Sequence, residues 1–281
     1  MNPTHIIGGY REFAPGAEAE SFCESVWIHQ TPNGPAPAGA AHRILPEMGV
    51  SLAFQGFRDP DGRPRDWSPI VAGPKLRAQV FDLLPGRELA AIKIKPEWVG
   101  PLLGIDPLAV EGQAVDLVGV APALANRLHD VLSQTRCAEA ALRVLMGEML
   151  TTHRASKTPP STVARIALDT VRHRAGQVSV ERLATTLGLS DRHFRRHIHD
   201  STGVSPKTYA RLLRFVEAMR TADRTVDPVW ADVAVTAGYF DQSHFIRDCV
   251  ALAGTSPSLL HSERRRQVIA ARAVSVLSNR A

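Results

Sequence analysis

The side chains best placed to do chemistry are three arginines on one short predicted helix. Phe194 and Ile198 are spaced i, i+4, which predicts that they face inward. The opposite side of the helix then carries Arg192, Arg195 and Arg196. Because a guanidinium can bond O6 and N7 of guanine together, Arg192 and Arg195 are predicted to read bases. Arg196 is predicted to contact a phosphate or to brace the helix.

The segment before these arginines occurs twice in the chain. Residues 183–188 (LATTLG) are repeated as residues 233–238 (VAVTAG), and the match resumes one residue later after the turn, pairing His193, Phe194 and Arg196 with His244, Phe245 and Arg247. A short helix, a glycine turn and a second amphipathic helix are typical of a helix-turn-helix, whose second helix enters the major groove of DNA. Three arginines alone would indicate a solvated face, but this context predicts a protein that grips DNA at two places.

The second copy offers a different set of base-reading groups. Phe245 and Cys249 are predicted to face the core, which leaves four side chains for the groove: Gln242, Ser243, Ile246 and Arg247. Glutamine bonds adenine bidentately, isoleucine can contact a thymine methyl group, and arginine can bind guanine or phosphate. Because Asp248 opposes the charge of Arg247, this helix is predicted to add less affinity than the first.

Positive charge is concentrated in the second half of the chain. Residues 161–281 contain 18 Lys or Arg and 11 Asp or Glu, a net charge of +7, whereas residues 1–160 contain 15 and 17, a net charge of −2. This asymmetry fits a nucleic-acid-binding domain attached to a different one. Neither an apolar run of about 18 residues nor a secretion signal is visible. With Cys23, Cys137 and Cys249 few and far apart, the chain is predicted to be cytoplasmic, without a membrane partner.

The first part of the chain, to about Ala121, predicts strands. Short apolar runs separated by Pro- and Gly-rich turns lie at 26–28, 49–54, 79–84 and 89–94. Their spacing predicts a small barrel or sandwich. Helical periodicity at about 122–152 predicts a helical hairpin, which either packs on the β-rich domain or forms a self-association surface.

The predicted fold class is therefore α+β, with a small β-barrel or sandwich-like N-terminal domain and an all-α C-terminal domain. A Pro-Pro pair within residues 153–161 has the composition of a linker. Residues 1–155 are predicted to sense an effector or to dimerise, residues 156–265 to form the double helix-turn-helix domain, and residues 266–281 to be a basic tail. Ser179 and Ser190 are predicted N-caps, and a long helix begins at Ser205-Pro206.

Residues 163–261 resemble the C-terminal domain of the AraC/XylS family of bacterial transcription regulators. The resemblance rests on two ordered signatures: Leu183-Ala184, Ser190, Arg192, Phe194, Arg196, Gly203-Val204-Ser205-Pro206, Tyr209, Arg214 and Ala218, then Val233-Ala234, Gly238-Tyr239, Asp241, Ser243-His244-Phe245, Arg247 and Gly254-Thr255-Ser256-Pro257. It implies a helical domain that binds double-stranded promoter DNA. The chain departs from the family pattern at Ile198, Trp230, Cys249 and Val250. The basic residue lost at Val250 again predicts a weaker second grip, and Trp230 is predicted to be a core substitution.

The N-terminal part resembles, through residues 43–54, the strand-rich domains that precede this module in some members of the family. The resemblance implies a domain that senses a small-molecule effector or mediates dimerisation. It also implies a homodimer, and RNA polymerase as a partner if the protein is an activator. The aromatic residues of this part either line a pocket or form the core, as is more usual in small β-domains: Trp27, Phe54, Trp67 and Trp98.

Other classes of function are less favoured by the residues. An alternative regulator would use its N-terminal domain only to dimerise or to bind a protein partner. The chain has no P-loop, dinucleotide-binding or nucleophile-elbow motif, and neither Cys23 nor Cys137 has the setting of a DNA-repair cysteine. His5, His29 and His42 occur singly rather than as a His-x-His metal site. We therefore predict no catalytic residue, no metal ligand and no cofactor, and rank an enzyme or repair protein carrying the same module last.

Overall fold

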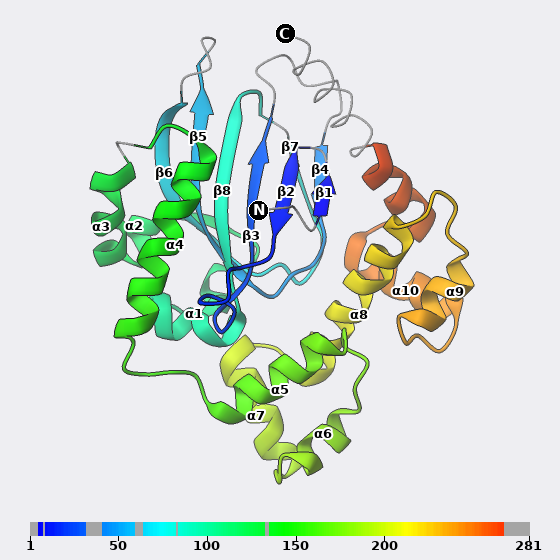
Figure 1. Ribbon diagram of the computed structural model, residues 1–281. Coiled ribbons are helices and arrows are strands. Elements are labelled where there is room, and N and C mark those ends of the chain that lie inside the picture. Colours follow the sequence, from blue (N-terminus) through cyan, green and yellow to red (C-terminus); the bar gives the residue numbers. More distant parts are fainter. Residues whose placement is uncertain are drawn as a thin grey trace.

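The computed structural model describes residues 5–7, 9–31, 41–59, 64–82, 84–132 and 135–266. An antiparallel sheet with helices against it forms the first part, and helices alone form the second part (Figure 1). The strands are β1 (His5–Ile7), β2 (Tyr10–Phe13), β3 (Cys23–Gln30), β4 (Ala41–Ile44), β5 (Val50–Arg58), β6 (Pro64–Ala72), β7 (Gln79–Asp82), β8 (Arg87–Ile94) and β9 (Ala114–Asp116). The helices of this part are α1 (Pro96–Leu103), the 3-10 turn η1 (Pro107–Val110), α2 (Leu117–Val120), α3 (Pro122–Leu132) and α4 (Ala138–Ala155).

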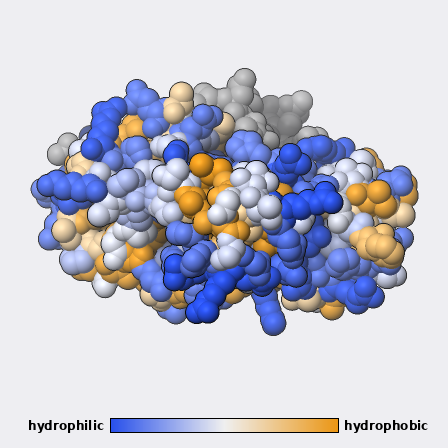
Figure 2. All heavy atoms as spheres, turned by 90° about the horizontal axis from the view of Figure 1, so that it is seen from below, coloured by the Kyte–Doolittle hydropathy of each residue, from blue (hydrophilic) through white to orange (hydrophobic). Residues whose placement is uncertain are grey.

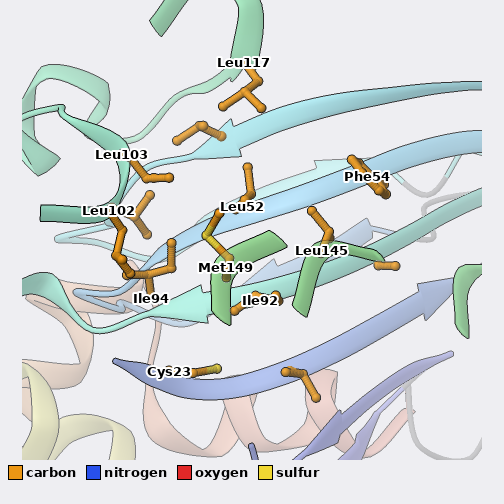
Figure 3. Packing of buried hydrophobic residues seen from close by; sticks show 14 of the residues in the cluster. Cys23, Leu52, Phe54, Ile92, Ile94, Leu102, Leu103, Leu117, Leu145 and Met149 are labelled. Atoms are coloured by element: carbon orange, nitrogen blue, oxygen red, sulfur yellow. The ribbon is translucent and has the colours of Figure 1, made fainter. Parts of the chain in front are cut away.

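The large sheet has the strand order β1-β2-β3-β8-β5-β6-β9 and one strongly apolar face. On this face Leu52 of β5 lies opposite Ile92 of β8, and both are fully buried. Leu145 and Met149 of α4 pack onto the same layer (Figure 3). Side chains alternate between the faces of a strand, so the residues between these large ones must point to the other side.

The second face of the sheet carries smaller side chains. Ser51 and Ala53 of β5 alternate with the large residues, and Ala91 of β8 lies opposite Ala53. A two-stranded antiparallel sheet, β4 with β7, lies over this face, and the rings of His29 on β3 and His42 on β4 are 5.6 Å apart. The domain is therefore sandwich-like over part of the sheet, with small residues between the layers.

The predicted strand segments overlap β3, β5, β7 and β8, although residue 49 precedes β5 and the segment at 79–84 extends past the end of β7. The sequence did not predict β1, β2, β4, β6 or β9. Pro64 and Pro69 interrupt β6, together with Arg65 and Asp66, so its apolar alternation is hidden. The helices α3 and α4 occupy the predicted hairpin segment. Because α4 buries Leu145 and Met149 against the sheet, its apolar stripe serves the core of this domain.

The second part of the chain is built around one long helix, α8 (Pro206–Asp223). Around it lie α5 (Thr162–His173), α6 (Val180–Thr186), α7 (Asp191–Thr202), α9 (Trp230–Thr236) and α10 (Gln242–Ala253), followed by helical residues 257–266. Phe194, Phe215 and Phe245 are fully buried in this cluster, which also takes in Met48 from the first part of the chain. No helix among the described residues has both the length and the apolarity to cross a membrane. From residue 267 onward, the predicted basic tail lies outside the residues that the structure describes.

Candidate nucleic-acid interface and interdomain cavity

The first helix-turn-helix motif consists of α6 and α7. Ser179 and Ser190 are the N-caps, as predicted, and each hydroxyl accepts a backbone N–H from the third residue onward, that of Arg182 at 3.2 Å and of His193 at 3.4 Å. Gly188 turns the chain between the helices with a φ of +68°, a backbone conformation that favours glycine. These local signals set the angle at which α7 leaves the turn.

One face of α7 is buried and the other is exposed. Phe194 and Ile198 are buried, whereas the three arginines predicted to contact DNA are exposed: Arg192, Arg195 and Arg196. Nε of Arg195 lies 2.7 Å from the Asp191 carboxylate one turn earlier, so this carboxylate competes with a base for its guanidinium. Seen from the end at which α6 and α7 lie, the surface is mostly hydrophilic, with smaller hydrophobic patches (Figure 2).

The second motif consists of α9 and α10 and repeats this construction. Gly238 has a φ of +80°, and the Asp241 carboxylate caps α10 by accepting the His244 N–H at 2.6 Å. Phe245 and Cys249 are buried, and the four predicted groove residues are exposed: Gln242, Ser243, Ile246 and Arg247. The structure thus brings the sequence-predicted site residues together on two outward helix faces.

Asp248 does not lie on the exposed face of α10. Its side chain is buried and forms an ion pair with Arg211 of α8 at 2.8 Å. The sequence reading had Asp248 opposing Arg247; in the structure its partner is Arg211, so it anchors α10 to α8. Trp230 packs at the start of α9, with its ring stacked 6.0 Å from Phe245 and edge-on 5.9 Å from His261. Trp230 is therefore partly buried and packs against the core.

The N-terminal domain contacts the helices around the first motif through α1 and η1. Arg172 of α5 donates to the buried Glu97 of α1 at 3.0 Å and to the Tyr209 hydroxyl of α8 at 3.1 Å. At the end of α7, Gly203 has a φ of +72°, and a Cβ there would lie 2.3 Å from the Leu108 side chain of η1. Glycine is required here both by the backbone conformation and by the close approach of the other domain.

A different region of the N-terminal domain contacts the second motif. Arg43 of β4 donates to Glu263 at 2.8 Å and to the carbonyl oxygen of Ala253, at the end of α10, at 2.9 Å. The backbone N–H of Ala78 donates to the carbonyl oxygen of Leu252 at 2.7 Å. Each motif is therefore held by its own set of contacts, and α8 runs between the two (Figure 1).

A cavity of about 250 Å³ lies on the second face of the sheet, enclosed by β4, β7 and α8; we call it the interdomain cavity. Trp27, Ala53 and Ile70 form its floor, and they lie in one cross-strand row in which Ala91 stands between Trp27 and Ala53. Its α8 wall is formed by four side chains: Tyr209, Leu213, Val216 and Arg220. On β5 the cavity-facing side chains Ser51 and Ala53 are small, whereas Leu52 and Phe54 face the core, and the longer side chains of Arg87, Leu89 and Lys93 on β8 line the walls.

One end of the interdomain cavity holds a closed ion network. The Glu47 carboxylate lies 2.8 Å from Nζ of Lys93 and 2.9 Å from Nζ of Lys75, and Glu12 lies 3.7 Å from Lys93. Burial alone would raise the pKa of Glu47, but Lys93 and Lys75 outweigh it and lower that pKa to about 2. Both lysines are therefore already neutralised by carboxylates of the same domain.

The cavity residues are the main feature that the sequence reading missed. Of the four aromatic residues considered for a pocket, Trp27 lines the cavity, whereas Phe54, Trp67 and Trp98 belong to the core. His29 and His42 are well separated in the sequence, but the fold brings their rings together at the cavity wall. No group of metal-ligating side chains is found in the part of the chain that the structure describes. The signal in the sequence that could have indicated the cavity is the alternation of small and large residues along β5.

Known proteins match the chain chiefly over the two motifs. Residues 183–262 match a family model described as a helix-turn-helix domain. Over 73 residues the chain is 34% identical to the HTH-type transcriptional activator RhaS of Enterobacter sp. (strain 638), and the match covers 26% of each protein. The chain thus spans about a quarter of the length of this curated relative.

Solved structures of similar shape include the C-terminal domain of AraT, a response regulator from Geobacillus stearothermophilus. It has 24% identity and a TM-score of 0.34, over 38% of this chain and 88% of that one. ToxT from Vibrio cholerae has 10% identity and a TM-score of 0.43, over 91% of this chain and 99% of that one. The two capped and glycine-turned helix pairs, together with the family match across both of them, show that residues 183–262 form a helix-turn-helix domain of the AraC/XylS type, which is found in DNA-binding transcription regulators.

Proposed function

We propose that this protein is a sequence-specific transcription regulator that reads promoter DNA with α7 and α10 and responds to a small molecule in the interdomain cavity. The observation that carries the DNA-reading part is the shared design of the two helices. Each buries a phenylalanine, Phe194 or Phe245, and presents its predicted base-reading side chains to solvent. A recognition helix must do both, since it has to be held firmly while its polar side chains reach base edges.

The DNA-binding unit in this proposal is residues 156–265. Arg192 and Arg195 read bases from α7, and Arg196 contacts phosphate or braces the helix. On α10, Gln242 and Arg247 contact bases or phosphate, with Ser243 and Ile246 beside them. Because α8 joins the motifs, the two helices enter successive major grooves about 34 Å apart.

The interdomain cavity supports the effector part of the proposal. Leu213 and Val216 of α8 face it, and α8 is the helix against which both motifs pack. Arg43 also lines the cavity while its guanidinium contacts the end of α10. A bound molecule would therefore touch groups that position both motifs, which favours an effector over an N-terminal domain that only binds a protein partner. Homodimer formation and contact with RNA polymerase stay predictions.

A binding selection from random duplex DNA tests the proposal directly. It is performed with the full chain and with the Arg192→Ala and Arg247→Ala variants, at two salt concentrations. Two short conserved blocks about one helical turn apart are expected, and each variant should relax its own block at a cost of about 1–3 kcal/mol.

An exposed arginine away from both motifs provides the matched control. Arg143 lies on α4, so Arg143→Ala should leave both blocks unchanged. Strongly salt-dependent binding without any sequence preference would contradict the proposal, because it would reduce the basic half to an electrostatic clamp.

A further inference from the structure

The two helix-turn-helix motifs both pack on α8, and they are also joined to each other directly. Among the residues that the structure describes, one hydrogen bond runs from the segment before α6 to the second motif: Nε2 of Gln177 donates to the carbonyl oxygen of Thr236 at 3.0 Å. Gln177 lies in the turn between α5 and α6, two residues before the N-cap Ser179 (Figure 1). Thr236 is the last residue of α9, and a helix leaves its last carbonyl oxygens without partners of its own. The bond therefore ties the start of the first motif to the middle of the second.

The turn of the second motif leaves room for the side chain of Gln177. Gly238 has a φ of +80°, and a Cβ at this position would lie 2.8 Å from Cγ of Gln177. This distance is shorter than real Cβ contacts allow, so a larger residue in the turn would displace the glutamine. Gln177 is thus packed against the backbone of this turn as well as hydrogen-bonded to the end of α9.

The turn that carries Gln177 has an unusual backbone. Ala175 and Gly176 both have positive φ values, +46° and +76°. For alanine this left-handed conformation is unfavourable, and it persists only where the surrounding structure holds it. Gly176 lies so close to α8 that a Cβ there would be 2.0 Å from the carbonyl oxygen of Ala210. Packing against α8 therefore holds the turn in the conformation that places Gln177 beside the second motif.

Arg214 of α8 completes this contact region. It donates to the carbonyl oxygen of Gly238 at 3.5 Å, and its guanidinium carbon lies 5.6 Å from the centre of the Tyr239 ring. A Cβ on Gly176 would also lie 3.0 Å from Cγ of Arg214. Helix α8, the turn before α6 and the turn of the second motif therefore meet at one place. We call Gly176, Gln177, Arg214 and Gly238 the inter-motif junction.

A fixed junction matters because a DNA duplex presents two blocks at one distance and one angle. One base pair added between the blocks moves the second block by about 3.4 Å and turns it by about 35° around the duplex axis. Two motifs that are locked together cannot follow this movement while both recognition helices stay in their grooves. The contacts at the junction must then break or the DNA must deform.

We infer that Gln177 is a positioning residue that holds the second motif in register with the first, so that the protein accepts one spacing of its two DNA blocks. This inference rests on the DNA-reading part of the proposed function. Binding to a shifted spacing breaks the bond between Gln177 and Thr236, and this loss adds to the cost of binding. Without Gln177 the added cost disappears, while both recognition helices keep their own contacts with DNA.

Fluorescence anisotropy with the full chain tests this inference. The duplexes carry the two selected blocks at the selected spacing, or with one base pair inserted or deleted between them. The ratio of the dissociation constants for shifted and selected spacing is the spacing penalty. It should be about tenfold or more for the unmodified chain. In Gln177→Ala the penalty should fall by about two- to tenfold, which is the range of one net hydrogen bond.

Two further variants separate this hydrogen bond from general effects. Gln177→Glu keeps the size of the side chain but has no N–H for the Thr236 carbonyl, so its spacing penalty should fall as in Gln177→Ala. Gln113→Ala changes an exposed glutamine of the N-terminal domain and should keep the penalty of the unmodified chain. An equal penalty in Gln177→Ala and the unmodified chain, or an equal fall in Gln113→Ala, would overturn the inference.

A distance measurement without DNA lets the two proposals fail separately. Nitroxide labels are attached at two exposed positions, Asp200→Cys on α7 and Val250→Cys on α10, in a chain that also carries Cys137→Ser. Double electron–electron resonance should give a narrow distance distribution in this chain and a broader one when Gln177→Ala is added. That result without sequence-specific DNA binding supports the positioning role and overturns the regulator proposal. Specific binding with an unchanged distance distribution and an unchanged spacing penalty overturns the inference and leaves the regulator proposal standing.

Discussion

The two helix-turn-helix motifs bury side chains at the same positions of α7 and α10, but they differ in the side chains that they expose to solvent. Phe194 corresponds to Phe245 and Ile198 to Cys249, and all four side chains are buried. On the outward face Arg192 corresponds to Ser243 and Arg195 to Ile246, so two cations of α7 have no counterpart on α10. Packing requires the buried positions to stay apolar, whereas the exposed positions can hold side chains of different charge and polarity. The first motif is thus built for charged contacts and the second for polar and apolar ones.

The two motifs also differ at one residue of the turn and at one buried residue of the second helix. Phe240 is the extra residue in the second turn, and 90% of its surface is exposed; nothing in the described structure accounts for it. Asp248 stands where α7 has His197, and its ion pair with Arg211 ties α10 to α8. Among the described residues, the ion pair between the first motif and α8 is the exposed contact of Glu181 with Lys207 at 3.8 Å, whereas the second motif has a buried carboxylate in its pair.

The largest expected effect is the loss of stability when the buried phenylalanine of either motif is truncated, which tests whether the two motifs are packed alike. Phe194→Ala and Phe245→Ala should each lower the free energy of unfolding by about 3–5 kcal/mol, because each leaves a large cavity in the same core. Urea denaturation measures both. Phe240→Ala is the control and should cost less than about 0.5 kcal/mol, since its ring is exposed. If only one buried phenylalanine proves costly, the two motifs are not packed alike.

Removing the anchor of the second motif should have the next largest effect. Arg211→Met leaves the Asp248 carboxylate buried without its partner, which should cost about 3 kcal/mol in urea denaturation. Adding Asp248→Leu should restore part of that stability, because no buried charge is then left unpaired. A cost no greater than that of Arg224→Met, at an exposed position, would show that the ion pair contributes nothing.

The difference in exposed chemistry should appear in DNA binding. Arg192→Ala should weaken binding to a selected duplex by about 1–3 kcal/mol, because arginine can bond guanine bidentately. Ser243→Ala, at the corresponding position, should cost about 1 kcal/mol or less, since it removes one neutral hydrogen bond. Fluorescence anisotropy with selected and scrambled duplexes measures both. Equal losses from the two changes would remove the contrast between the motifs.

The smallest expected effect is a pH dependence of the free energy of unfolding, caused by His261 near the second motif. His261 is buried, and its Nε2 lies 3.2 Å from the carbonyl oxygen of Ala222. Burial lowers its pKa below the ordinary value of 6.5. As the pH falls below 6.5, the unfolded chain takes up a proton that the folded chain does not. The free energy of unfolding should therefore fall toward the lower pKa of the folded state and be constant above 6.5.

Urea denaturation at about pH 7.5 and 5.5 measures this dependence. His261→Gln should show a smaller loss of stability between the two pH values than the unmodified chain. The pKa of His153 is also lowered by burial, so His153→Gln is examined in parallel. An unchanged pH dependence in His261→Gln would assign the effect to other groups.

Much of the helical half could be predicted because its signals are local. Ser179, Ser190, Gly188 and Gly238 each act within a few residues, and the i, i+4 spacing of Phe194 and Ile198 already defines a buried face. The side chains that are predicted to face outward on each recognition helix follow from that spacing alone. Its roles on DNA stay predictions.

The N-terminal half was less predictable because its signals depend on distant partners. Small residues such as Ala53 and Ala91 weaken a strand pattern unless one knows which face meets α4 and which meets α8. Interruption by proline hid β6 in the same way. The sequence therefore predicted strands here without predicting the space between the layers.

The two helix-turn-helix motifs follow from local sequence, because caps, glycine turns and helical periodicity are encoded by neighbouring residues. Their connection to the sheet follows from tertiary packing. Arg43 meets Glu263 across 220 residues of chain, Glu97 meets Arg172, and Arg87 meets Gln55 at the wall of a cavity that α8 closes. Such pairings depend on how whole elements pack, and no local pattern carries that information.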